Sequence, residues 1–227
     1  MEIKPIARIK SDFKTKFGIP RQPGLAPALE AAIVFEEEYR TPDALRGLGD
    51  FSHLWIIWEF SENIRADFSP TVRPPRLGGD VRLGVFATRS PFRPNPVALS
   101  CVRLLEVKQT ENDGTVLIVS GADLMDGTPI YDIKPYIPYA DCKIDATGGF
   151  TTNADDFLLT VDFAPELLQK VPKNRREALI AVLSHDPRPS YQADSERVYG
   201  MEFAGFDIRF TVNEKTLTVR EVTALCK

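Results

Sequence analysis

Apolar and polar residues alternate along several short segments of this 227-residue chain. A period of two is typical of β-strands with one buried face. The pattern predicts strands at residues 3–9, 31–37, 81–87, 97–105, 116–120 and 129–133. Residues 54–60 are almost continuously apolar, which predicts a strand buried on both faces. Turn residues recur at short intervals between these segments, so this region predicts a sandwich or barrel and not a doubly wound α/β sheet.

A change in composition divides the chain near residues 146–153, where small and polar residues follow one another. Beyond this expected linker, residues 157–163 predict a strand and residues 173–184 an amphipathic helix. Alternation at residues 206–212, a turn, and a further apolar strand predict a hairpin. We therefore expect a mainly β domain at residues 1–146 and a smaller α+β domain at residues 153–227.

Composition excludes several classes of protein. Hydrophobic residues make up 43% of the chain and charged residues 26%, as in ordinary globular proteins. No apolar run approaches the roughly 18 residues that span a bilayer, and the N-terminus lacks the apolar core of a signal peptide. Three widely spaced cysteines favour reduced thiols in a cytoplasmic protein. The two histidines lack metal-ligand spacing, so we expect no metal site, and Gly47-Leu48-Gly49 precedes a predicted strand, which excludes a dinucleotide fingerprint.

Positive charge is concentrated in one part of this acidic chain. The net charge is −4, but residues 65–103 carry seven arginines and two aspartates, a net +5, so the remainder carries −9. A basic segment in an acidic protein indicates a local anion site, although a solvated basic face gives the same pattern. All of these cations are arginine, which favours bidentate contacts with phosphate or carboxylate groups.

Three polar segments are candidates for chemistry. In residues 86–96, prolines restrict the backbone around Arg93 and Asn95, and such a pre-ordered loop lowers the entropic cost of binding. The structural alternative is a rigid corner in which arginine caps carbonyl groups. Residues 71–79 repeat the Arg-Pro pattern, for which a plain surface loop is the alternative. Residues 132–136 place alternate polar side chains on one side of an extended segment, as a solvated strand face also would.

Seven segments in this order resemble the signature of the TrmO-type tRNA methyltransferases. They are Pro20-Arg21-Gln22-Pro23-Gly24, Phe51-Ser52-His53-Leu54-Trp55, Arg73-Pro74-Pro75-Arg76-Leu77-Gly78-Gly79, Gly84-Val85-Phe86-Ala87-Thr88-Arg89-Ser90, Arg93-Pro94-Asn95-Pro96, Asp126-Gly127-Thr128-Pro129 and Asp132-Ile133-Lys134-Pro135-Tyr136. Asp186-Pro187-Arg188-Pro189 resembles the family's C-terminal motif. The similarity covers nearly the whole chain.

This resemblance implies an N-terminal β-barrel that binds S-adenosylmethionine, a smaller C-terminal domain and a homodimer. It implies tRNA as substrate, methylated on N6 of N6-threonylcarbamoyladenosine at position 37. The cofactor contacts that it implies are Pro20, Arg21, Gln22, Ser61, Glu62, Arg89, Leu99, Gly121, Ala122 and Asp123. At Ser61 and Glu62 the family has a His-Gln-like pair, so contacts made by the backbone are the ones expected to survive there.

The residue types fit this chemistry. Arg21 or Arg89 is expected to hold the cofactor carboxylate, and Asp123 to accept from its ribose or amine. Asp132 or Tyr136 is a candidate base, and Asn95 is a further catalytic candidate. The substrate-binding candidates are Arg73, Arg76, Arg93 and Lys134, with Arg93 or Lys134 on the threonyl carboxylate.

Two other functions are compatible with the sequence. A non-catalytic RNA- or nucleotide-binding barrel would use its arginines only to grip phosphate. Alternatively, the same cofactor site would serve a small-molecule acceptor. Cofactor binding separates the first alternative from an enzyme, and product analysis on tRNA separates the second from a tRNA methyltransferase.

Overall fold

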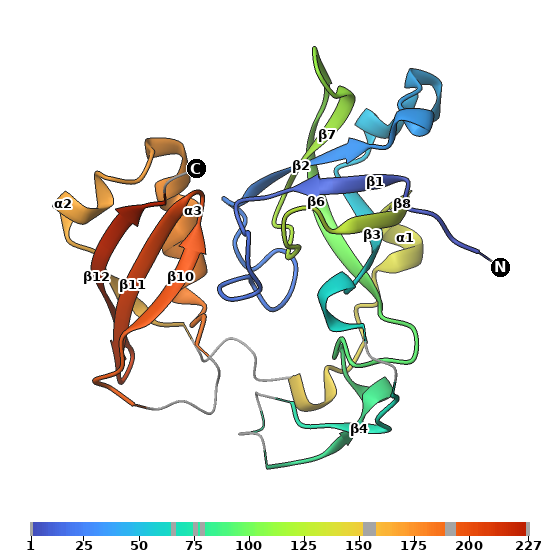
Figure 1. Ribbon diagram of the computed structural model, residues 1–227. Coiled ribbons are helices and arrows are strands. Elements are labelled where there is room, and N and C mark those ends of the chain that lie inside the picture. The colour runs from blue at the N-terminus through green and yellow to red at the C-terminus, as the bar shows by residue number, and fades with distance from the viewer. Residues whose placement is uncertain are drawn as a thin grey trace.

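The structure is a computed structural model that describes residues 2–64, 67–74, 77, 80–151, 158–188 and 194–225. Its larger sheet has six antiparallel strands. These are β1 (Ala7–Lys10), β2 (Glu30–Phe35), β3 (His53–Glu59), β6 (Val97–Thr110), β7 (Gly114–Ser120) and β8 (Pro129–Pro135). They pair in the order β1-β2-β7-β6-β3-β8, and β8 also pairs with β1, so the sheet closes into a barrel (Figure 1). The prediction of a mainly β protein is confirmed.

Alternate side chains of the six strands fill the barrel. The buried set includes Ala7, Ile9, Ile33, Phe35, Leu54, Ile56, Trp58, Val102, Leu104, Leu117, Val119 and Ile130. The prediction that residues 54–60 are buried on both faces is wrong, because burial alternates along β3 and only the inward side chains are buried. Trp55 and Ile57 lie half-buried on the outer wall. The apolar run thus reflects one core face and one apolar outer face.

The strand predicted at residues 81–87 is also largely wrong. Only Leu83–Gly84 (β5) is extended, and it pairs with Thr71–Val72 (β4). A 3₁₀ turn follows at Val85–Ala87. Val85 is fully buried, and its burial comes from this turn and not from a strand facing a core.

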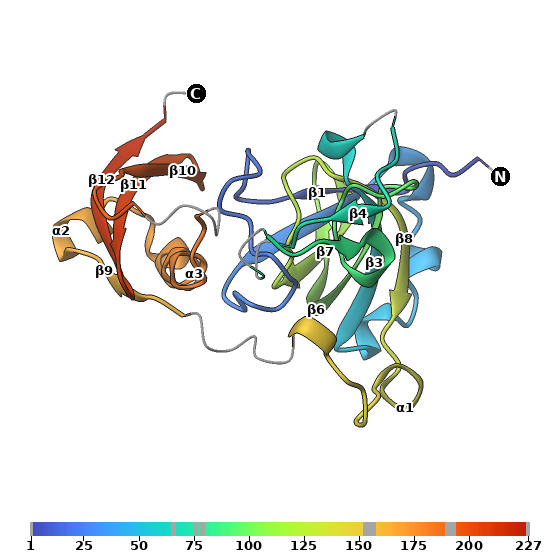
Figure 2. The same ribbon diagram turned by 90° about the horizontal axis from the view of Figure 1, so that it is seen from below.

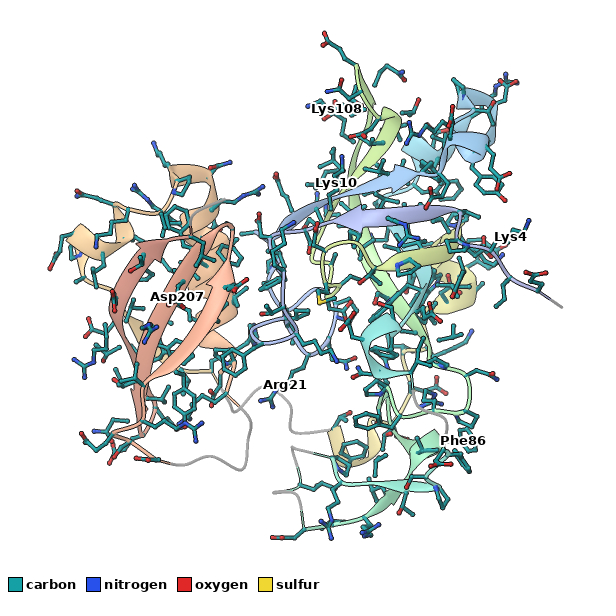
Figure 3. All side chains as sticks on the ribbon, in the orientation of Figure 1. Lys4, Lys10, Arg21, Phe86, Lys108 and Asp207 are labelled. Atoms are coloured by element: carbon teal, nitrogen blue, oxygen red, sulfur yellow. The ribbon has the colours of Figure 1, made fainter. Side chains whose placement is uncertain are left out.

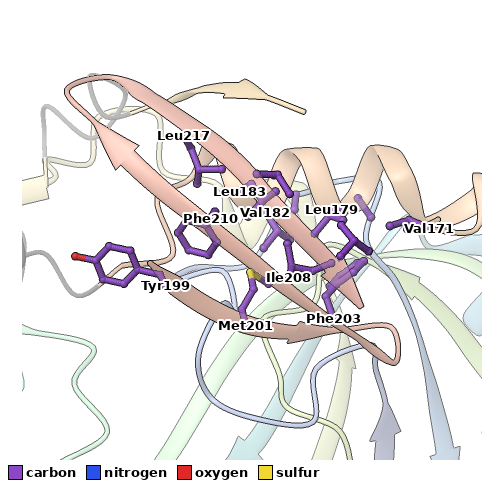
Figure 4. Close-up of a cluster of buried hydrophobic side chains, with 14 of the residues drawn as sticks. Val171, Leu179, Val182, Leu183, Tyr199, Met201, Phe203, Ile208, Phe210 and Leu217 are labelled. Atoms are coloured by element: carbon purple, nitrogen blue, oxygen red, sulfur yellow. The ribbon is translucent and has the colours of Figure 1, made fainter. Parts of the chain in front are cut away.

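A four-stranded sheet forms the C-terminal part of the chain. Its strands are β9 (Thr160–Asp162), β10 (Tyr199–Phe203), β11 (Phe206–Asn213) and β12 (Thr216–Ala224), in the order β10-β11-β12-β9. Helix α3 (Lys173–Ser184) packs its apolar side chains onto one face, where Leu179, Val182 and Leu183 meet Ile208 and Phe210 (Figure 4). The predicted helix and the β11–β12 hairpin are confirmed, whereas β10 was not predicted.

The two remaining α-helices of the described residues are single turns, α1 (Pro138–Asp141) and α2 (Pro165–Leu168). Within the described part of the chain, no helix has the length and apolar composition to cross a membrane.

The loop between β1 and β2 lies between the barrel and the C-terminal sheet, as both views show (Figures 1 and 2). Phe13, Ala26 and Leu29 from this loop are buried in the core of the C-terminal sheet. Asp12 accepts a hydrogen bond from the Ala204 amide through its carbonyl and pairs with Arg175 at 3.1 Å through its carboxylate. The same loop carries the Pro20–Gly24 motif, so the C-terminal sheet supports its position.

Candidate functional site

Several of the expected cofactor segments meet at one end of the barrel, where β3 ends and β6 begins. The amide of Gly24 donates to the Gly121 carbonyl at 2.8 Å, which joins the first loop to the segment after β7. Arg89 Nη1 donates to Gln22 Oε1 at 2.5 Å, which joins the proline-rich loop to the first loop. These contacts bring together segments that are separated by about 30 to 100 residues in the sequence.

The contact between the first loop and the segment after β7 requires glycine. Gly121 has φ +75°, a left-handed conformation that disfavours side chains. A Cβ atom at Gly121 would lie 3.0 Å from the Gly24 Cα and 3.1 Å from its amide nitrogen. The Gly121 amide donates to the Leu29 carbonyl at 2.9 Å, so both sides of the junction are backbone. The close approach therefore cannot relax by moving a side chain.

We expect Gly121→Ala to weaken S-adenosylmethionine binding by about tenfold or more and to lower the melting temperature, because it forces the two loops apart. Gly127→Ala is the matched control, since Gly127 has φ +78° but open space around its Cα. It should show only the backbone cost of roughly 1 to 2 kcal/mol. Calorimetry and thermal melting on both variants measure the difference, and equal effects would mean that only backbone strain matters.

A chain of hydrogen bonds holds Asp123 at the same end of the barrel. Trp58 Nε1 donates to Ser100 Oγ at 2.9 Å, and Ser100 Oγ donates to Asp123 Oδ1 at 2.6 Å. Burial raises the pKa of Asp123 to about 6, while the Ser100 hydrogen bond and the Arg89 charge act in the opposite direction. Asp123 is thus a partly desolvated acceptor that favours a donor or a positive charge beside it.

Arg21 is held by the C-terminal motif. Its Nη2 donates to the Arg188 carbonyl at 2.7 Å and to the Asp186 carbonyl at 3.4 Å. Arg188 in turn donates from Nε and Nη2 to the two carboxylate oxygens of Asp186, each at 2.9 Å. Figure 3 shows Arg21 between the two sheets. The Asp-Pro-Arg motif therefore supports the first loop from the C-terminal side.

Ser61 and Glu62 form a 3₁₀ turn directly after β3. Lys16 Nζ donates to the Glu62 carbonyl at 2.7 Å and to Asn63 Oδ1 at 3.0 Å. The turn therefore lies beside the loop that carries the Pro20–Gly24 motif, and Glu62 contacts Lys16 of that loop through its backbone carbonyl.

The other candidates lie on the outer wall of the barrel, in register across three strands. Ile57 of β3 pairs with Leu99 of β6 on one side and with Asp132 of β8 on the other. The expected cofactor contact Leu99, 51% exposed, is therefore two strand spacings from Asp132, about 10 Å. In the next row, Trp55 of β3 pairs with Cys101 of β6 on one side and with Lys134 of β8 on the other.

Polar candidates on this wall interact with one another. Lys134 Nζ lies 2.8 Å from Asp132 Oδ2, and both side chains are partly exposed. The Tyr136 ring lies 5.7 Å from the Trp55 ring and 6.3 Å from the His53 ring, beside the start of β3 and therefore further from the cofactor end than Asp132, which pairs with Ile57. Desolvation and nearby acidic groups raise the pKa of Tyr136. Asp132 is thus the candidate base nearer to the cofactor segments.

A cavity of about 470 Å³ adjoins the junction of the two loops. Its lining residues are Gly24, Pro27, Glu30, His53, Cys101, Arg103, Leu105, Ser120 and Gly121. The volume is within the range of small-molecule sites. The cavity extends from the Gly24–Gly121 contact along the outer wall of β6 over Cys101, Arg103 and Leu105, on the side away from Leu99.

The arginine-rich loops differ in what their side chains contact. Arg93 Nη1 donates to the carbonyls of Val85 and Thr88 at 3.1 and 2.8 Å, so this arginine caps carbonyl groups in a rigid corner. Arg73 is exposed, and Arg76 lies outside the described residues. Asn95 is exposed just before β6, at the cofactor end of the barrel.

Comparison with known proteins identifies the family. Residues 8–142 match the family model described as the tRNA-methyltransferase O N-terminal domain, and residues 157–225 match the TrmO C-terminal domain. The chain belongs to the TrmO family. Its relatives include a tRNA (adenine(37)-N6)-methyltransferase of Escherichia coli K12, 40% identical over 221 residues that cover 94% of each chain.

Other relatives extend this picture. A Pseudomonas aeruginosa protein named as a candidate S-adenosylmethionine-dependent methyltransferase, RcsF, is 39% identical and covers 92% of this TrmO-family chain and 91% of its own. A crystal structure of TrmO from Pseudomonas aeruginosa superposes with a TM-score of 0.78 at 32% identity, covering 99% of this chain and 98% of the other.

Sequence reasoning missed three supporting residues of this TrmO-family site. Trp58 and Ser100 hold Asp123, and Lys16 holds the turn after β3. One signal was available for Ser100. It occupies an inward register position between Ala98 and Val102, where a hydroxyl group must find a buried partner.

Proposed function

We propose that this chain is an S-adenosylmethionine-dependent tRNA methyltransferase that methylates N6 of N6-threonylcarbamoyladenosine at position 37. The observation that carries the proposal is the junction at the barrel end. There Gln22 bonds to Arg89 and Gly24 to Gly121, which joins three of the segments that correspond to the family's cofactor contacts, and the charge of Arg89 acts on Asp123. The names of the relatives support the reaction, and the specific modified adenosine comes from the resemblance of the motifs.

The donor set fits the cofactor. S-adenosylmethionine supplies an electrophilic methyl group on a sulfonium, together with an ammonium and a carboxylate. Asp123 favours a nearby donor or positive charge because its carboxylate is partly desolvated. Arg89 is the better candidate for the carboxylate, since its Nη1 donates to the side chain of Gln22, whereas Arg21 Nη2 donates to two backbone carbonyls of the C-terminal motif. Glycine backbone at Gly24 and Gly121 leaves the adjoining cavity open for the rest of the cofactor.

Positioning is expected to supply most of the acceleration. The acceptor nitrogen is urea-like, so its lone pair is delocalised and it is a weak nucleophile. Holding it against the methyl group contributes about 7 to 11 kcal/mol in favourable cases. Asp132 is the proposed base for the N–H proton, with Tyr136 as the alternative, and a base adds about 10²- to 10⁴-fold. Asn95 is proposed to orient the reacting group from the cofactor end.

The threonyl carboxylate of the substrate requires a cation. Lys134 is the better candidate, because Arg93 Nη1 is already shared between two carbonyls and Lys134 is exposed beside Asp132. Arg73 and Arg76 are proposed to contact tRNA phosphates. We also propose the division into residues 1–146, which bind the cofactor, and residues 153–227, together with a homodimeric state and a cytoplasmic location.

The deciding experiment is incubation with labelled S-adenosylmethionine and tRNA that carries or lacks the threonylcarbamoyl group. Nucleoside mass analysis should find one added methyl group on N6 of the modified adenosine and none on unmodified tRNA. Binding of the cofactor without transfer to either RNA would contradict the proposal and favour a binding protein. Transfer to a small molecule alone would favour the same site with a different acceptor.

A further inference from the structure

Two phenylalanine rings lie exposed side by side on the arginine-rich segment. The Phe86 side chain is 72% exposed and Phe68 is 52% exposed. Their ring centroids are 6.3 Å apart with an interplanar angle of 26°, a stacked arrangement. Figure 3 shows Phe86 at the periphery of the molecule, on the part of the chain near β4. Single exposed apolar residues are ordinary, but a stacked pair presents a continuous aromatic surface.

The backbone beneath Phe86 is rigidly held. Val85 is fully buried and its amide donates to the Pro70 carbonyl at 2.9 Å, which ties the Phe86 segment to the Phe68 segment. Arg93 fixes the other side, since its Nη1 bridges the Val85 and Thr88 carbonyls. The backbone that carries the ring is therefore held before any partner binds, which lowers the entropic cost of binding.

Positive charge lies beside the rings. The Arg93 guanidinium lies 5.6 Å from the Phe86 ring centroid. Arg82, which donates to Thr71 Oγ1 at 3.1 Å, and the exposed Arg73 come from the adjoining β4–β5 hairpin. The whole segment of residues 65–103 carries a net +5 in a chain of net −4. An aromatic surface with one arginine against it and others on the adjoining hairpin is complementary to unpaired nucleotides, which offer both flat bases and negative phosphates.

We propose that Phe68 and Phe86 form a stacking platform for an unpaired base of the RNA substrate, next to the adenosine that is methylated. This inference rests on the proposed function. The platform lies close in sequence to the cofactor segments, because Arg89 follows Phe86 by three residues and donates to Gln22. A base stacked there would hold the RNA loop beside the cofactor end of the barrel, and the arginines would hold its phosphates.

A second copy of the chain is a less suitable occupant of the platform. A two-fold interface through this surface would be formed by the same patch from each copy. The arginines of one copy, among them Arg73, Arg82 and Arg93, would then face those of the other. Like charges at short distance oppose such an interface, whereas an RNA loop neutralises them.

The test is binding of an anticodon stem-loop RNA at several salt concentrations, measured by fluorescence anisotropy. Phe68→Ala and Phe86→Ala should each weaken binding by about 5- to 150-fold, the range for loss of one base–aromatic stack. The slope of log K against log salt should not change, because no charge is lost. Arg73→Ala should instead reduce that slope by about one. Phe86→Trp should retain binding.

Val81→Ala is the matched control, because Val81 is 48% exposed in the same loop region but has no ring. It should bind like the wild type, and a blunt RNA duplex should not distinguish the phenylalanine variants from the wild type. Wild-type affinity in both alanine variants would overturn the platform. So would a loss of affinity that accompanies dissociation of a dimer in sedimentation. Phenylalanine-dependent binding without methyl transfer would contradict only the proposed function.

Discussion

Asp123→Asn is expected to bind S-adenosylmethionine about tenfold or more weakly than the wild type, and yet to melt at a higher temperature at about pH 8. Both effects follow from the raised pKa of Asp123, which is about 6 because the carboxyl group is buried. At pH 8 the wild-type carboxylate is ionised at a cost to stability. Asparagine has nearly the same shape, accepts the Ser100 hydrogen bond and carries no charge.

The sign of the pH dependence is opposite for stability and for binding. The folded-state pKa lies above that of an unfolded aspartate, so the contribution of Asp123 to the free energy of unfolding is fully present below about pH 4. It is lost as the pH rises through about 6, with a magnitude of roughly 3 kcal/mol. A cationic cofactor favours the carboxylate, so cofactor affinity should rise with pH through about 6 and then level off.

Calorimetry between about pH 5 and 8 measures how cofactor affinity depends on pH, and thermal melting over the same range measures how stability does. The asparagine variant should show neither dependence. Ser100→Ala should move the midpoint of the binding curve to higher pH, because it removes a hydrogen bond that lowers the pKa of Asp123. If Asp123→Asn binds the cofactor as tightly as the wild type at pH 8, Asp123 does not contact the cofactor.

The sequence predicts a helix or strand correctly where apolar residues recur with one regular spacing over neighbouring positions. The helix at residues 173–184 and the hairpin around residues 213–216 appear as expected, since each follows from neighbouring residues. The strand predicted at residues 81–87 is largely wrong, because Val85 is buried in a turn whose position is fixed by a hydrogen bond to Pro70. The prediction that residues 54–60 are buried on both faces is wrong, because apolar content alone does not distinguish a core face from an apolar outer wall.

The candidate site was predictable as a set of segments but not as an arrangement. Motif resemblance selected Gln22, Arg89 and Gly121, while their contacts depend on how the barrel closes. The hydrogen bond from Arg21 to the Arg188 carbonyl could not be predicted, because the two residues are far apart in the sequence and meet only in the folded chain. Trp58 illustrates the remaining gap. Its apolar body belongs to the core pattern, but its indole N–H supports Asp123 through Ser100.

Asp132→Asn should lower turnover by at least tenfold while leaving cofactor affinity within a few-fold of the wild type. Asp132 lies on the outer wall of β8, about two strand spacings from Leu99, so it is placed to act on an acceptor and not on the cofactor itself. Loss of turnover without loss of binding indicates an interaction made mainly in the transition state. Single-turnover kinetics and calorimetry measure the two quantities.

Lys134 complicates the interpretation, because its Nζ lies 2.8 Å from Asp132 Oδ2. If Lys134 binds the threonyl carboxylate, Lys134→Ala should raise the KM for modified tRNA and narrow the preference over unmodified tRNA. If Lys134 only pairs with Asp132, the two single variants should show the same kinetic defect. The double variant then tests coupling, since independent roles give additive free energies and a shared role does not.

The position of Asp132 in the middle of β8 allows a clean stability control. Both oxygens of its carboxylate have partners, since Oδ1 accepts a hydrogen bond from the Ile133 amide and Oδ2 pairs with Lys134. Asparagine can keep the first contact, and the second joins two partly exposed side chains, which limits its worth to about 1 kcal/mol. The variant should therefore melt within a few degrees of the wild type. A folded Asp132→Asn enzyme with full turnover would remove Asp132 as the base. Catalysis would then rest on Tyr136, which Tyr136→Phe tests directly, or on positioning of the acceptor alone.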